Sequence, residues 1–167
     1  MLATNIMYEE QFTRWVAWND RDTLDGIKYP GIYAAAITNQ NISGHTFSWM
    51  PEIIYIGMTN AVSGLKGRLK QFDNTVIGKT GHGGADRVLY KHQDYEELKS
   101  NLYVSVRPFQ CNVKSNEPAD LRVMGEVAKF EYDCFACFVE RYAELTEFNN
   151  KKQSPKYSLT IGRNNGR

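Results

Sequence analysis

Two short apolar runs joined by a polar connector constrain the fold of this chain more than any other feature. The first run spans residues 31–37 (Gly-Ile-Tyr-Ala-Ala-Ala-Ile), and the second spans residues 53–57 (Ile-Ile-Tyr-Ile-Gly). Both have the length and composition of buried strands. The stretch 39–44 between them is polar and contains glycine, which is typical of a hairpin loop. The two runs are therefore expected to be antiparallel neighbours.

The rest of the chain predicts one more strand and several helices. Leu102, Val104 and Val106 alternate with other residues up to Pro108, which indicates a third strand. Helical spacing of apolar residues occurs at about 5–20, 65–72, 86–92 and 116–145. The expected fold class is α+β, with a small three-stranded, mostly antiparallel sheet flanked by helices and an added N-terminal helix.

The N-terminal helix is predicted from four apolar residues. Tyr8, Phe12, Trp15 and Val16 follow the i, i+4, i+7, i+8 spacing of an amphipathic helix over residues 5–20. No linker interrupts the 167 residues, so we expect a single domain over 1–167. Its core would span about 28–151, and residues 151–167 would form a basic tail.

Composition excludes several classes of protein. The chain is 42% hydrophobic and 23% charged, which is ordinary for a globular protein, and no run approaches the roughly 20 apolar residues of a membrane span. We expect a cytoplasmic protein with no membrane partner. The pair Cys134 and Cys137 suggests zinc, but the sequence lacks a second ligand pair at the usual spacing.

The net charge of +1 is weak evidence for nucleic-acid binding, but the distribution of the basic residues is more informative. They gather at 66–70, at 79–91 and in the tail 151–167, and these clusters could line one groove. Ordinary solvated surface charge is the alternative interpretation of each cluster.

One carboxylate in the long helix predicted at 116–145 occupies an unusual position. At about 100° per residue, Glu131 points along the apolar stripe of this helix, close to Val127 and Phe138. A buried carboxylate requires a cation, a metal or a hydrogen-bond network as partner. Arg68, beside the apolar stripe of the helix at 65–72, could supply the cation, either in a structural ion pair or in a functional site.

The two strand motifs resemble those of a known family. Gly31-Ile32-Tyr33 and Tyr55-Ile56-Gly57 match the two triplets that name the GIY-YIG nucleases, in the same order and each on an apolar strand. The resemblance covers roughly residues 28–151. Tyrosines on adjacent strands are also common core residues, which is the plain alternative.

The resemblance implies a set of site residues. In the family, the second strand is followed by a helix with an essential arginine, and a later helix carries an essential glutamate, often after an aromatic residue. Arg68 and Phe130-Glu131 match these positions. His82 looks equivalent to a histidine or lysine found in many members, and Phe72 stands where some members carry a second histidine. The closing asparagine of the family would be Asn149 or Asn150, and we assign it to Asn149.

The implied activity is metal-dependent hydrolysis of DNA phosphodiester bonds. Tyr33 would be the general base, Arg68 would bind the scissile phosphate, and Glu131 would hold Mg²⁺ or Mn²⁺. Tyr55, His82 and Asn149 would complete the catalytic set. The residues expected to contact the substrate are Gly31, Gly57, Lys66, Lys70 and Lys79.

The small size of the chain favours a stand-alone enzyme of the restriction or phage type, acting on double-stranded DNA. Because one site cuts one strand at a time, symmetric cleavage would require a homodimer. The alternative function is a non-catalytic DNA-binding or interaction module with the same fold. A nucleotide-binding loop at 78–84 is less favoured, because no Gly-Lys-Ser/Thr follows the glycines.

Overall fold

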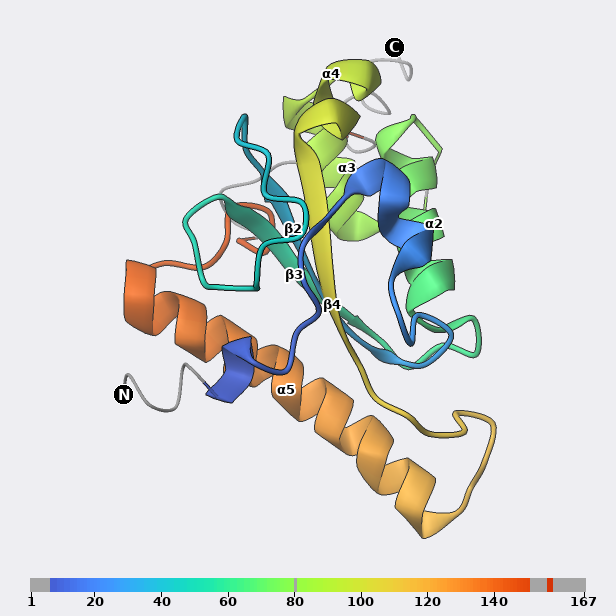
Figure 1. The fold of residues 1–167 in the computed structure, drawn as a ribbon. Coiled ribbons are helices and arrows are strands. Elements are labelled where there is room, and N and C mark those ends of the chain that lie inside the picture. Colours follow the sequence, from blue (N-terminus) through green and yellow to red (C-terminus); the bar gives the residue numbers. More distant parts are fainter. Residues whose placement is uncertain (1–6, 80, 151–155, 158–167) are drawn as a thin grey trace.

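The computed structural model describes residues 7–79, 81–150 and 156–157, and its fold is α+β (Figure 1). The sheet has four antiparallel strands in the order β1-β4-β2-β3. The strands are β1 (Val16–Ala17), β2 (Gly31–Ile37), β3 (Ile53–Thr59) and β4 (Leu102–Pro108). Strand β2 lies in the middle and pairs with both β3 and β4. Both edges of β2 are therefore paired, which holds its side chains in fixed positions.

The predicted hairpin is confirmed, since β2 and β3 pair antiparallel with Tyr33 opposite Gly57. The third strand is also confirmed as β4. The sheet has four strands and not the expected three, because the short strand β1 adds to the outer edge of β4.

The prediction of an N-terminal helix over residues 5–20 is wrong. In the described part of that range only residues 7–9 are α-helical, and Val16–Ala17 form β1. The backbone N–H of Thr13 donates to the Val106 carbonyl, and that of Trp15 donates to the His45 carbonyl. The backbone groups of this segment thus form hydrogen bonds with the edge of the sheet and with a nearby loop, which keeps the segment extended. The helical spacing of its apolar residues could not predict these contacts.

The helices lie on both faces of the sheet (Figure 1). They are the 3-10 helix η1 (Trp18–Thr23) and the α-helices α2 (Gly64–Val76), α3 (Gly83–Lys91), α4 (Tyr95–Asn101) and α5 (Pro118–Tyr142). Helix α5 begins with a proline in its first turn, where the missing N–H of proline costs no helical hydrogen bond. None of the helices in the described ranges is long and apolar enough to cross a membrane.

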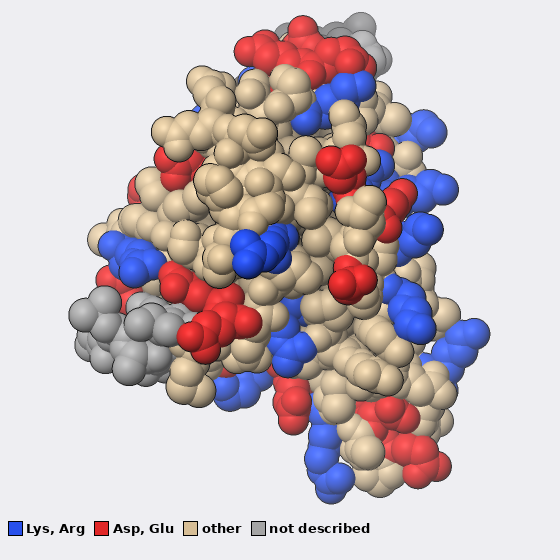
Figure 2. Space-filling model, in the orientation of Figure 1, with Lys and Arg blue, Asp and Glu red and all other residues tan. Residues whose placement is uncertain are grey.

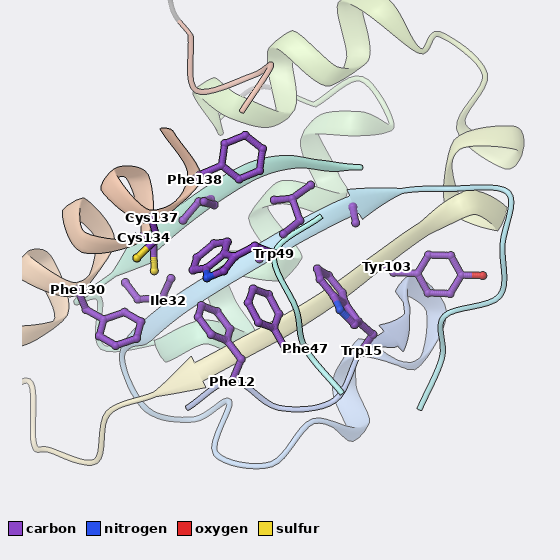
Figure 3. Packing of buried hydrophobic residues seen from close by; sticks show 14 of the residues in the cluster. Phe12, Trp15, Ile32, Phe47, Trp49, Tyr103, Phe130, Cys134, Cys137 and Phe138 are labelled. Atoms are coloured by element: carbon purple, nitrogen blue, oxygen red, sulfur yellow. The ribbon is translucent and has the colours of Figure 1, made fainter. Parts of the chain in front are cut away.

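Two hydrophobic clusters, one on each face, hold the sheet between the helices. One cluster combines side chains of η1, α2 and α3 with Tyr33 and Ala35 of β2. The other combines α5 with the N-terminal segment and the connector between β2 and β3 (Figure 3). In this second cluster Phe12 stacks on Phe47 with ring centroids 4.1 Å apart, and Trp49 is buried beside them. The polar connector is thus anchored by its aromatic residues.

Candidate functional site

The two motif tyrosines lie on the same face of the sheet, beneath α2 and α3. Tyr33 is opposite Gly57 and Ala35 is opposite Tyr55, so the two tyrosines are diagonal neighbours with ring centroids 5.8 Å apart. A Cβ on Gly57 would lie 2.6 Å from the Tyr33 hydroxyl oxygen and 2.7 Å from Tyr55 Cε1. The glycine of the second triplet is therefore needed so that both rings can occupy this face.

His82 joins the tyrosines to helix α3. Its Nε2 lies 2.5 Å from the Tyr33 hydroxyl oxygen, and both side chains are almost fully buried. Its Nδ1 accepts hydrogen bonds from the backbone N–H groups of Gly84 and Ala85, so the imidazole is the N-cap of α3. The buried ring of Phe72 packs against His82 with centroids 5.0 Å apart.

These hydrogen bonds determine the tautomer of His82. Because Nδ1 accepts two N–H groups, the single proton of a neutral ring must be on Nε2, which then donates to the Tyr33 oxygen. Burial, assisted by the charge of Arg68, lowers the pKa of His82 to about 3. His82 is therefore neutral at physiological pH and acts as a hydrogen-bond donor to Tyr33.

Arg68 of α2 brings a positive charge near His82 and Tyr33. One guanidinium nitrogen, Nη1, donates to the Gln71 side chain over 2.7 Å. The Nε atom is buried and has no hydrogen-bond partner among the described residues. A buried guanidinium donor without a partner is costly, so this atom points to a missing acceptor. A phosphate oxygen would satisfy it.

Glu131 belongs to α5, which packs on the opposite face of the sheet from α2. Helix α5 buries Val127, Phe130 and Cys134, so its core-facing side is centred closer to these residues than to Glu131. The expected position at the centre of the stripe is therefore corrected: Glu131 lies at its border and is partly exposed. The charge of Glu131 raises the pKa of Tyr55.

The pKa values of both tyrosines reflect the balance between burial and nearby charge. Burial raises the pKa of Tyr33 well above 10, followed by the effect of Tyr55, while Arg68 acts in the opposite direction. Burial also raises the pKa of Tyr55, and Arg68 again opposes it. The Arg68 guanidinium thus lowers the pKa of Tyr33, but burial outweighs this effect.

Asn149 lies beside the tyrosines, at the free edge of β3. Its Oδ1 accepts from the Ile56 N–H and its Nδ2 donates to the Ile56 carbonyl, both over 2.8 Å. Thr146 also donates to Oδ1. The Asn149 side chain thus makes the backbone hydrogen bonds that a further strand would make with β3, at the residue next to Tyr55. This contact fixes β3, and a catalytic role for Asn149 stays a prediction.

The residues expected to contact the substrate are not brought together. Lys66 and Lys70 are exposed, and each is separated from Arg68 by roughly 160° around α2. Lys79 is exposed in the loop after α2. Gly31 and Gly57 are buried in the sheet, where a Cβ on Gly31 would meet the Arg107 carbonyl oxygen. The two glycines therefore have packing roles in this structure.

Two cations near the site, Arg87 and Lys156, belong to the basic clusters at 79–91 and 151–167 but were not singled out from the sequence. Arg87 of α3 is only 9% exposed, donates to the Gly83 carbonyl over 2.9 Å, and lowers the pKa of His82 by its charge. A Cβ on Gly83 would lie 3.3 Å from Lys156 Nζ, so this residue of the expected tail returns to the start of α3. The other residues of the tail, except Tyr157, lie outside the described residues. The clustering of basic residues in the sequence was the signal for both cations, but it did not indicate which members lie near the site.

Comparisons with known proteins gave no match: no family model, no curated protein and no solved structure corresponds to this chain. The resemblance to the GIY-YIG nucleases thus depends on the motif residues alone.

The buried neutral His82 predicts a stability that depends on pH. Its pKa is about 3 in the folded chain and about 6.5 when unfolded, so the unfolded chain binds the proton first as the pH falls. The free energy of unfolding is expected to fall below pH 6.5, by up to about 1.4 kcal/mol per pH unit from this residue.

His82→Asn keeps a capping acceptor for α3 but removes the titrating ring. Urea unfolding of the wild type and of His82→Asn between pH 7 and pH 4 measures the difference. We expect a shallower loss of stability in the variant, and parallel curves would contradict a neutral, buried His82.

Proposed function

We propose that the protein is a metal-dependent endonuclease that hydrolyses phosphodiester bonds of double-stranded DNA. The observation that carries the proposal is the buried Arg68 Nε atom without a partner, beside two tyrosines and a histidine that donates to one of them. This combination supplies an anion-binding group next to a group that can accept a proton. The two motif triplets support the same reaction.

Arg68 would bind the scissile phosphate. Its Nη1 is already held by Gln71, which fixes the plane of the guanidinium, and its Nε remains available for a phosphate oxygen. The positive charge would offset the negative charge that develops on the phosphorus-bound oxygens in the transition state. The charge of Arg87, close to Tyr55 and His82, would add to this effect.

Tyr33 would accept the proton of the attacking water. The water oxygen forms a bond to phosphorus, the bond to the leaving oxygen breaks, and the proton moves to the Tyr33 oxygen. His82 donates to that oxygen from Nε2, and together with the charge of Arg68 it would stabilise the phenolate. Because burial raises the pKa of Tyr33, only a small fraction of the enzyme has the active base at pH 7.

Glu131 is the residue that would hold Mg²⁺ or Mn²⁺. The described residues contain no group of three or more His, Cys, Asp or Glu side chains that could hold a metal alone. Mg²⁺ is nevertheless often bound by one or two carboxylates together with waters and substrate phosphates. A partly exposed carboxylate near Tyr55 fits that pattern. The ion would neutralise charge on the phosphate and stabilise the leaving oxygen.

The biological role that we propose is sequence-specific cleavage in the cytoplasm, of the restriction or phage type. In this role the residues around the site would also select the DNA. Base-edge contacts would determine which sequence is cut.

Cleavage of plasmid DNA tests the proposed activity directly. Supercoiled plasmid DNA incubated with the protein in Mg²⁺ is expected to be nicked, and EDTA is expected to stop the reaction. Glu131→Gln removes the charge but keeps the size of the side chain, and it is expected to lower the rate roughly a hundredfold or more.

The matched control is Glu126→Gln, which changes an exposed glutamate of the same helix. It is expected to cleave like the wild type. Absence of nicking on varied DNA would refute the nuclease, while cleavage that survives Glu131→Gln would refute the site. A gel shift without cleavage would favour the DNA-binding module.

A further prediction concerns the pH dependence of the cleavage rate. Since the base is a phenolate with a raised pKa, the single-turnover rate is expected to rise about tenfold per pH unit between pH 6 and pH 9. No inflection is expected near pH 6.5, because His82 stays neutral over this range. Tyr33→Phe should remove the reaction, and a rate that falls with rising pH would exclude Tyr33 as the base.

A further inference from the structure

Helix α5 has a second apolar face, on the side away from the sheet. Its buried residues form one stripe, which includes Val127, Phe130 and Cys134. A second row of exposed residues runs along the helix at about 100° per residue, roughly opposite the buried stripe. This row, which we call the outer stripe, contains no charged residue and consists of Leu121, Gly125, Ala128, Tyr132, Ala136 and Val139.

The outer stripe exposes large apolar side chains. Leu121 is 49% exposed, Tyr132 is 72% exposed and Val139 is 38% exposed. The solvent side of an amphipathic helix normally carries charged residues, and an apolar row on both sides is typical of a helix covered on both sides. The described residues cover only the sheet side of α5. Within the described ranges the outer stripe is therefore left uncovered.

The charges next to the outer stripe indicate which partner fits. Along one side of it, Arg122, Glu126 and Lys129 lie in the N-terminal half of α5, and Asp133 and Glu140 lie in the C-terminal half. Figure 2 shows basic and acidic side chains side by side in the lower part of the view, where α5 lies in Figure 1. Within the described residues Lys129 binds Asp133, whereas Arg122 and Glu140 have no ion-pair partner.

This charge pattern is complementary to itself when the helix direction is reversed. Arg122 and Glu140 lie equally far from residue 131 on either side of it. In an antiparallel helix pair with a two-fold axis near residue 131, Arg122 of each copy faces Glu140 of the other. Across the two-fold axis, the flank of one helix that carries these charges lies next to the same flank of the other helix. Both Arg122–Glu140 pairs therefore form at once.

The sizes of the residues in the outer stripe fit the same pairing. Gly125, Ala128 and Ala136 have little or no side chain, which allows the two helix axes to approach closely. The two-fold axis places the large Tyr132 of one copy beside the stretch of the other copy that contains Ala128. In the same register Leu121 of one copy lies near Val139 of the other, and Gly125 lies near Ala136, so large side chains meet toward the two ends of the contact and small ones meet between them.

We propose that α5 is a dimerisation helix, which binds a second copy of this chain in antiparallel orientation through the outer stripe. The pairing does not depend on the proposed nuclease activity. It would place Glu131 of each copy near the two-fold axis and on the same side of the helix pair. Two candidate sites would then lie close together, which suits cleavage of both strands of a duplex.

Sedimentation equilibrium of the full chain without DNA tests the proposal. The wild type is expected to be a dimer at micromolar concentration. Tyr132→Lys is expected to weaken the dimer by roughly tenfold or more, with an unchanged circular dichroism spectrum. Val62→Lys, which alters an apolar residue of similar exposure (60%) outside α5, is the matched control and should leave the dimer intact.

Exchange of the two charges distinguishes a second copy from any other partner. Arg122→Glu and Glu140→Arg should each weaken the dimer several-fold, and the double variant carrying both changes should restore it, because both ion pairs are then reversed. A monomeric wild type, or a Tyr132→Lys variant as dimeric as the wild type, would overturn the proposal. A double variant weaker than either single variant would overturn the antiparallel arrangement.

Discussion

The hydrogen bond between Tyr33 and His82 joins the middle strand of the sheet to helix α3, and the candidate site is arranged around it. A buried phenol needs a partner, and a buried imidazole must remain neutral. The two groups meet both requirements together, because the N-cap contacts of His82 place its proton on the nitrogen that faces Tyr33. Gly57 and Gly84 complete the arrangement, since a Cβ on either would collide with Tyr55.

The parts of the fold that depend on local patterns could be predicted from the sequence. The hairpin of β2 and β3 followed from two apolar runs and a polar connector, and α5 followed from a long helical pattern after Pro118. Arg68 and Glu131 were assigned from motif positions. The charges of both act on the pKa of Tyr55, Arg68 lowering it and Glu131 raising it. Their catalytic roles remain the subject of our proposal.

The parts that depend on distant contacts could not be predicted. Helical spacing in residues 8–16 was overridden by pairing of the chain with the edge of β4. The role of Asn149 at the edge of β3 depends on a peptide group far away in the sequence. Likewise, the burial of Arg87 depends on how α3 packs against α2, which no local motif describes.

The central claim is that Glu131 holds a metal ion beside Tyr33, Tyr55 and Arg68. The most direct measurement is the Mg²⁺ concentration that gives half of the maximal single-turnover rate on a duplex oligonucleotide, for the wild type and for Glu131→Asp. The shortened carboxylate should raise this concentration roughly tenfold or more, since even indirect changes at metal sites commonly have such effects. An unchanged Mg²⁺ requirement in Glu131→Asp would contradict the account.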